Sequence, residues 1–214
     1  MTDGAARFPI AVLVSGAGTN LQALIDRIHQ DPAEPGEIVL VVASSADAPA
    51  LERARAAGIP TAVVSRDEHP DRVRRDEALA DVVAASGAAL VVMAGWMSIV
   101  TGAFLDRFPD RVLNLHPSLL PSFPGMHAIE EALAWGVRVT GVTVHFAEEQ
   151  VDGGPPVLQR AVPVVYGDTV ASLRERIRTV EHELLSEAVS LFSRGAVRRD
   201  PGQPRQVEIL REDG

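Results

Sequence analysis

The sequence predicts an α/β fold in which a mostly parallel, twisted sheet is covered by helices on both faces. Short runs rich in Val and Ile alternate with longer segments of helical periodicity, which is typical of parallel sheets whose strands are buried on both sides. The length of 214 residues suits one well-buried domain. With 46% hydrophobic and 23% charged residues, the composition is that of a globular protein rather than a disordered one.

Each element follows from its local pattern. The first strand is predicted at 9–14, and after a glycine turn a helix begins at 20–25. Apolar runs enriched in β-branched residues predict further strands at 38–43, 61–64, 88–94, 112–115 and 137–146. Helical spacing predicts helices at 50–57, 72–85 and 169–192, the first of them closed by Gly58. We therefore expect one domain over 1–214, with a core of roughly 9–195 and a tail at 196–214 that contains one edge strand at 207–210.

Composition and charge exclude several classes of protein. Cysteine is absent, which removes disulfide scaffolds, thiolate nucleophiles and cysteine-bound metal sites. The net charge of −9 argues against a nucleic-acid-binding surface. No secretory signal is visible at the N-terminus, and no apolar run approaches the roughly 20 residues that span a bilayer. A soluble cytoplasmic protein that binds neither nucleic acid nor membrane is the expectation.

The turn Ser15-Gly-Ala-Gly-Thr-Asn20 lies between the first strand and the first helix. Free backbone N–H groups and the helix dipole converge at such a point, which favours a bound phosphate. The turn lacks the third glycine of a dinucleotide fingerprint and the Gly-Lys-Ser/Thr of a P-loop, so the phosphate should belong to a smaller molecule. A tight turn in which Gly18 supplies an unusual backbone angle is an equally good interpretation.

The segment Asn114-Leu-His-Pro-Ser-Leu-Leu-Pro121 leaves a buried strand at the edge where ligands gather in α/β sheets. Asn114 and His116 are two residues apart and therefore point the same way, offering an amide donor and an imidazole that can act as acid or base. A single His after a strand is more often a structural group than a catalytic one. Asp152, in Val151-Asp-Gly-Gly-Pro155, could pair with an imidazole and raise its pKa, but Asp-Gly is also an ordinary turn.

In this order and spacing, these three motifs resemble the folate-dependent glycinamide ribonucleotide transformylases. The resemblance extends over nearly the whole chain and includes Met93-Ala-Gly-Trp-Met97 and Glu181-His182. The Asn-x-His-Pro-Ser-Leu-Leu-Pro segment is highly specific for enzymes that use 10-formyltetrahydrofolate, and the Ser-Gly-x-Gly-Thr-Asn turn narrows this to the glycinamide ribonucleotide branch. The resemblance implies a single Rossmann-like formyltransferase domain.

The resemblance also implies roles for individual residues. The catalytic residues would be Asn114, His116 and Asp152. The ribonucleotide would be bound by Gly18, Thr19, Asn20 and Glu181. The folate would be bound by Arg72, Met97, Ser98, Ile99, Val100 and Asn114. Two positions depart from the family pattern, because Ser98 and Ser122 stand where many members carry Arg and Lys.

The implied reaction is direct attack of an amine on the formyl carbon. Asn114 and a protonated His116 would stabilise the oxyanion, Asp152 would keep His116 charged, and a proton would pass to the departing folate nitrogen. The reduced folate would be a co-substrate, with no metal and no tightly bound prosthetic group. The partners would be small-molecule substrates, and a homodimer is compatible with this picture.

Three alternatives remain open at the level of sequence. A methionyl-tRNA formyltransferase shares the Asn-x-His-Pro core but resembles this chain with an added basic C-terminal domain. A formyltetrahydrofolate deformylase usually carries an N-terminal regulatory domain, whereas here the first strand begins almost at once. A non-enzymatic nucleotide-binding module would leave the three catalytic-type residues without a role.

Overall fold

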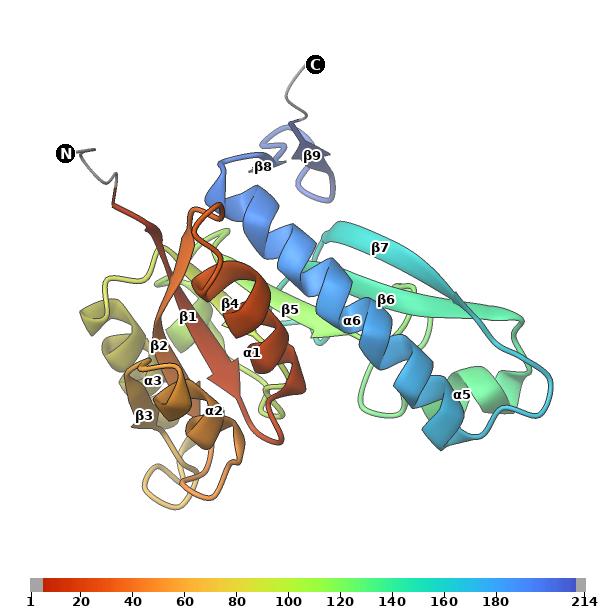
Figure 1. Ribbon diagram of the computed structural model, residues 1–214, viewed down its shortest axis with the longest axis horizontal. Helices are drawn as coiled ribbons and strands as arrows, with labels where there is room; N and C mark the ends of the chain where they lie inside the picture. The colour runs from red at the N-terminus through yellow and green to blue at the C-terminus, as the bar shows by residue number, and fades with distance from the viewer. Residues whose placement is uncertain (1–5, 211–214) are drawn as a thin grey trace.

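A seven-stranded sheet forms the centre of the molecule, which Figure 1 shows as a computed structural model describing residues 6–210. The strand order is β3-β2-β1-β4-β5-β6-β7. The first five strands in the chain are parallel: β1 (Phe8–Val14), β2 (Gly36–Ala43), β3 (Thr61–Val63), β4 (Leu90–Met93) and β5 (Val112–His116). The antiparallel strands β6 (Val139–Phe146) and β7 (Pro156–Pro163) extend the sheet beyond β5. The predicted mostly parallel sheet is confirmed.

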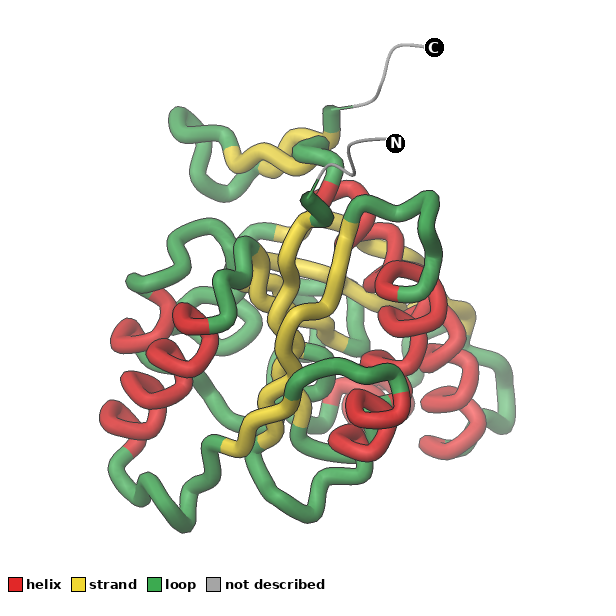
Figure 2. The backbone as a smooth tube through the Cα atoms, turned by 60° about the vertical axis from the view of Figure 1, so that its left-hand side comes forward, coloured by secondary structure: helices red, strands yellow, loops and turns green. Residues whose placement is uncertain are grey.

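Helices cover both faces of this sheet, as Figure 2 shows. They are α1 (Thr19–Leu24) with a π-helical continuation η1 (Ile25–His29), α2 (Ala50–Ala56), α3 (Arg72–Ala85), α4 (Gly102–Leu105), α5 (Ala128–Trp135) and α6 (Val170–Ser193). Alternate residues of β1 enter different cores: Ile10 and Val12 pack with α1 and α6, whereas Ala11 and Leu13 pack with α3. Burial on both faces explains why this strand is a continuous apolar run.

The long helix α6 brings the end of the chain back onto its beginning. Thr169 caps it, with its hydroxyl accepting from the Ser172 backbone N–H while the Ser172 side chain accepts from that of Thr169. Its apolar face, including Leu173 and Ile177, is buried in the same core as α1. This packing places the middle of α6 beside the start of α1.

The structure contains elements that the sequence pattern did not predict. Strand β7 begins and ends with proline, a pattern that argues against a central strand, and it lies at the edge of the sheet where proline is tolerated. Helices α4 and α5 are short and fall in segments for which no helix or strand was predicted. The predicted edge strand at 207–210 exists as β9 (Val207–Ile209), but it pairs with β8 (Val197–Arg199) in a separate hairpin rather than with the main sheet.

Within residues 6–210, no helix is both long enough and apolar enough to cross a membrane.

Candidate active site

A cavity of about 330 Å³ lies beside the carboxyl ends of β4 and β5. This is the position where ligands bind in open α/β sheets. Its wall brings together nine of the residues singled out from the sequence: Asn20, Met97, Ser98, Ile99, Val100, Asn114, His116, Asp152 and Glu181. Gly18 and Thr19 precede Asn20 in the same turn but do not line the cavity, and neither does Arg72.

Asn114 is held by a partner that sequence reasoning did not identify. The register of β5 and β6 pairs Asn114 with His145, and the Asn114 Nδ2 lies 3.1 Å from His145 Nε2. His145 Nδ1 lies 2.8 Å from the Phe146 carbonyl, which can only accept, so Nδ1 carries the proton and Nε2 accepts from the Asn114 amide. The second amide hydrogen faces Asp152 Oδ1 at 3.5 Å. The amide donor is thereby fixed in orientation before any ligand binds.

His116 is buried, and both of its ring nitrogens face protein acceptors. Nε2 lies 2.8 Å from the Phe123 carbonyl and Nδ1 lies 3.3 Å from Asp152 Oδ2. Burial lowers the pKa of His116 below its ordinary value and outweighs the Phe123 carbonyl and Asp152 carboxylate, which both favour the charged ring. The structure therefore differs from the expectation that Asp152 keeps His116 charged. Asp152 acts in that direction, but removal of the ring from water is the larger effect.

Asp152 occupies a strained backbone position. Its φ of 52° is left-handed, a conformation that non-glycine residues adopt rarely. The Gly125 backbone N–H donates to its Oδ2 at 2.7 Å. Burial raises the pKa of Asp152, but the hydrogen bond from the Gly125 N–H and the neighbouring His116 oppose this effect, and the pKa lies below its ordinary value. The carboxylate is therefore charged at neutral pH.

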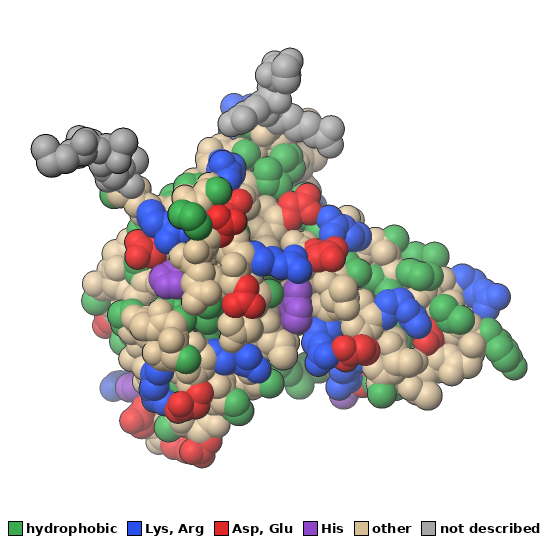
Figure 3. Space-filling view, in the orientation of Figure 1, with side chains coloured by type: hydrophobic (Ala, Val, Ile, Leu, Met, Phe, Trp, Pro, Cys, Tyr) green, Lys and Arg blue, Asp and Glu red, His purple; other side chains and the backbone are tan. Residues whose placement is uncertain are grey.

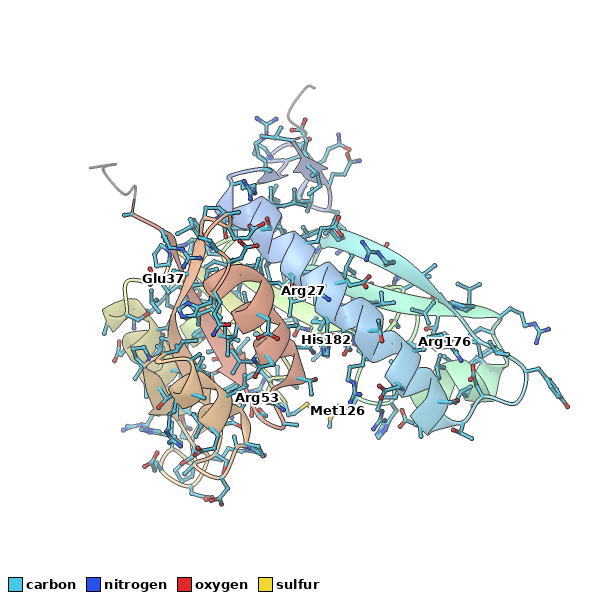
Figure 4. The ribbon with its side chains drawn as sticks, in the orientation of Figure 1. Arg27, Glu37, Arg53, Met126, Arg176 and His182 are labelled. Carbon is cyan, nitrogen blue, oxygen red and sulfur yellow. The ribbon has the colours of Figure 1, made fainter. Side chains whose placement is uncertain are left out.

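The glycine turn is fixed by contacts with α2. Gly18 has a left-handed φ of 71°, and an added Cβ would lie 2.6 Å from the Ala50 Cβ. A larger residue at Gly18 would thus displace α2. Arg53 of α2, labelled in Figure 4, donates to the Ala17 carbonyl at 2.8 Å and so supports the turn.

Charged side chains of both signs are interspersed on the face shown in Figure 3, without one broad basic patch. Glu181 of α6 lines the cavity opposite these loops. Burial raises its pKa above the ordinary value, while Asn20 and the charges of Arg174 and Arg178 oppose the shift. The Oδ1 atom of Asn20 is buried and has no hydrogen-bond partner among residues 6–210. A polar ligand at this end of the cavity would meet one amide oxygen and one carboxylate.

A buried ion pair holds the loop after β4. Arg75 and Asp76 are 3% and 0% exposed and lie 2.7 Å apart. Arg75 also donates to the Ile99 carbonyl at 3.1 Å, and Asp76 Oδ2 accepts from the Thr101 backbone N–H at 2.7 Å. These contacts fix the apolar stretch from Met97 to Val100 against the cavity. Sequence reasoning missed this pair, although charged residues on the buried side of a predicted helix were a usable signal.

Arg72, predicted to lie near the folate, is exposed at the first position of α3. It does not contribute to the cavity wall. Among residues 6–210, no group of three or more His, Asp or Glu side chains is arranged to hold a metal ion.

Comparison with known proteins identifies one family. Its sequence profile, described as formyl transferase, matches residues 8–189. The phosphoribosylglycinamide formyltransferase of Haemophilus influenzae is 40% identical over 189 residues, which cover 88% of this chain and 89% of that protein. The human trifunctional purine biosynthetic protein adenosine-3 is 45% identical over 188 residues, or 88% of this chain. The chain spans about a fifth of the vertebrate trifunctional proteins that it matches, since the alignments cover 18–19% of them.

The fold is similar to that of a solved structure. Glycinamide ribonucleotide transformylase 1 from Symbiobacterium toebii superimposes with a TM-score of 0.92 and 45% sequence identity. The superposition covers 99% of this chain and 98% of that one.

Proposed function

The chain belongs to the formyl transferase family, and on that basis we propose that it transfers the formyl group of 10-formyltetrahydrofolate to the amine of glycinamide ribonucleotide in purine biosynthesis. The observation that carries the proposal is the meeting of Asn114, His116 and Asp152 at one cavity. Relatives named for this reaction are similar to the chain over most of its length. The proposed setting is the cytoplasm, with the two small molecules as partners.

In the proposed reaction, the amine nitrogen first bonds to the formyl carbon to give a tetrahedral intermediate, and the bond from that carbon to the folate nitrogen breaks when the intermediate collapses. Negative charge grows on the formyl oxygen as the tetrahedral intermediate forms. His145 accepts one hydrogen of the Asn114 amide, and the other, which makes only a 3.5 Å contact with Asp152 Oδ1, would be donated to that oxygen. Each such donor contributes about 3 kcal/mol in comparable sites. Because His145 already holds the amide, only this long contact is given up when the charge develops.

The reaction also moves one proton. The attacking amine loses a proton and the departing folate nitrogen gains one, so a group between them must accept and then return it. His116 suits this role because its lowered pKa leaves the ring able to accept a proton near neutral pH and makes the resulting imidazolium a ready acid. Asp152, 3.3 Å away, stabilises that transient positive charge. Release of Nε2 from the Phe123 carbonyl would let the ring reach substrate.

We assign the two substrates to opposite ends of the cavity. The ribonucleotide phosphate would bind the turn of Gly18, Thr19 and Asn20, with its glycinamide group near Glu181. The pterin would lie against the loop from Met97 to Val100 and contact its backbone. At position 98 a serine stands in place of the usual Arg, so folate binding there would depend on backbone and apolar contacts rather than on a charged side chain.

A purified-protein assay tests the proposal. The protein is incubated with 10-formyltetrahydrofolate, with and without glycinamide ribonucleotide, and formyl transfer and formate release are followed separately. We expect consumption of the folate to require the ribonucleotide and to give the formylated ribonucleotide in equal amount. Formate release without the ribonucleotide would instead identify a deformylase. Formylation only when methionyl-tRNA is supplied would identify the tRNA enzyme.

A further inference from the structure

The C-terminal hairpin β8–β9 reaches the loop that carries Asp152. Arg199 in β8 forms ion pairs with Glu148 at 2.6 Å and with Asp110 at 2.7 Å. Arg205, in the turn of the hairpin, donates to the Gly153 carbonyl at 2.8 Å. One arginine thus contacts the start of the 147–154 loop and the other contacts the residue after Asp152.

The hairpin is itself attached to the body of the molecule. Val197, Val207 and Ile209 pack against the main hydrophobic core. The Arg199 Nε donates to the Pro204 carbonyl at 2.7 Å, which ties this side chain to the turn that carries Arg205. The two guanidinium groups are therefore presented from a surface with a defined position, not from a free tail.

The loop needs external contacts to keep its shape. Asp152 has a left-handed backbone, and such strain persists only when the surroundings over-determine it. Gly154 approaches the Phe146 carbonyl so closely that a Cβ there would lie 1.8 Å from the oxygen. Since the Asp152 carboxylate meets His116 at 3.3 Å, a small shift of the loop would change the geometry of that pair.

We propose that Arg199 and Arg205 are positioning residues, through which the C-terminal hairpin holds the 147–154 loop so that the Asp152 carboxylate stays against His116. This inference rests on the proposed formyl transfer. Neither arginine lines the cavity, so neither is expected to touch substrate. Their contribution is the orientation of a group that acts at the reacting atoms, and small misplacements of such groups reduce turnover strongly.

The test compares R199A, R205A and the double variant with wild type and with R198A. Arg198 is the matched control, because it lies in the same hairpin and its ion pair within residues 6–210 is with Glu208, 2.6 Å away. We would measure kcat, the KM for each substrate, the pH profile of kcat, the melting temperature and hydrogen exchange of the amides of 148–154. R199K and R205K test whether a positive charge at these positions is enough to restore kcat.

We expect the double variant to lose about tenfold in kcat with little change in either KM, which is the pattern of a misplaced catalytic group. Exchange in 148–154 should accelerate. The acid limb of the pH profile, which follows protonation of His116, should move to lower pH, because the carboxylate that raises the pKa of His116 lies farther away. The Lys variants should recover part of kcat, and R198A should behave as wild type.

Two results would overturn the proposal: unchanged loop exchange in R205A, or faster exchange with kcat and pH profile unchanged in the double variant. A lower melting temperature in R199A would leave a general loss of stability as another cause of its lower kcat. R205A then tests the positioning role by itself, since Arg205 is exposed and its removal leaves the ion pair between Arg199 and Glu148 in place. A wild-type protein without formyl transfer would refute the proposed function instead. In that case loop exchange in R205A still decides whether the hairpin holds the loop.

Discussion

Replacing Asp152 by Asn removes one charge while leaving the side-chain shape almost unchanged. At an effective dielectric constant of about 20, a unit charge 3.3 Å from His116 Nδ1 favours the imidazolium by about 5 kcal/mol. The carboxylate is itself partly desolvated, and an Asn oxygen can still accept from the Gly125 N–H, so we expect about 3 kcal/mol of this to be lost in the transition state. That loss corresponds to a decrease in kcat of at least about a hundredfold.

The same substitution has a spectroscopic consequence. Because the Asp152 charge raises the pKa of His116 against the lowering effect of burial, its removal should lower the pKa of His116 further. NMR titration of the His116 ring protons, alongside steady-state formyl transfer, measures both effects. D67N is the matched control, because Asp67 is an exposed carboxylate outside the cavity. Turnover within a few-fold of wild type, or a rise in the pKa of His116, would refute the role assigned to Asp152.

Three further substitutions probe the groups around this centre. H145F should lower kcat by about tenfold with little change in substrate affinity, since the Asn114 amide loses the acceptor that orients it. Steady-state kinetics measures both quantities, and a rise in KM with unchanged kcat would contradict this role of His145. D76N should lower the free energy of unfolding by about 3 kcal/mol, because Arg75 is left as a buried unpaired charge. Chemical denaturation measures this free energy, and a decrease as small as that of an exposed substitution would contradict the prediction. The raised pKa of Glu181 means that, as pH falls, its charged form is lost at a higher pH than for an ordinary carboxyl group. Calorimetry should show weaker ribonucleotide binding in that pH range. The same pH dependence in E181Q would exclude Glu181 as the cause.

The sequence predicted the parallel part of the sheet because its inner strands, such as β1 and β4, are buried on both faces; the edge strand β3 is only half-buried. Helix α3 lies at the predicted 72–85, and α6 begins one residue after the predicted 169 and ends one residue beyond 192. Asn114 and His116 could be placed together because side chains alternate along a strand. Their chemical role required more, since the residues alone also allowed a structural histidine.

Other parts of the site depend on long-range pairing that a local pattern does not contain. The role of His145 could be recognised only from the antiparallel register, which places it opposite Asn114. The raised pKa that an Asp–His pair suggests was reversed by burial of His116, and burial depends on the loops packed above it. The segment of β8 and β9 was expected to be a tail with one edge strand, because its Pro and Gly content gave no sign of the contacts made by Arg199 and Arg205.

The packing of α6 on α1 has a consequence for synthesis of the chain. Asn20 lies near the beginning of the polypeptide and Glu181 near its end, yet both line one cavity. A nascent chain that has already formed its parallel strands still lacks one wall of this cavity until α6 has emerged from the ribosome. Contacts of such long sequence separation are formed late and slowly. Ligand can therefore stabilise the finished protein, but it cannot guide the folding of the first half while translation is under way.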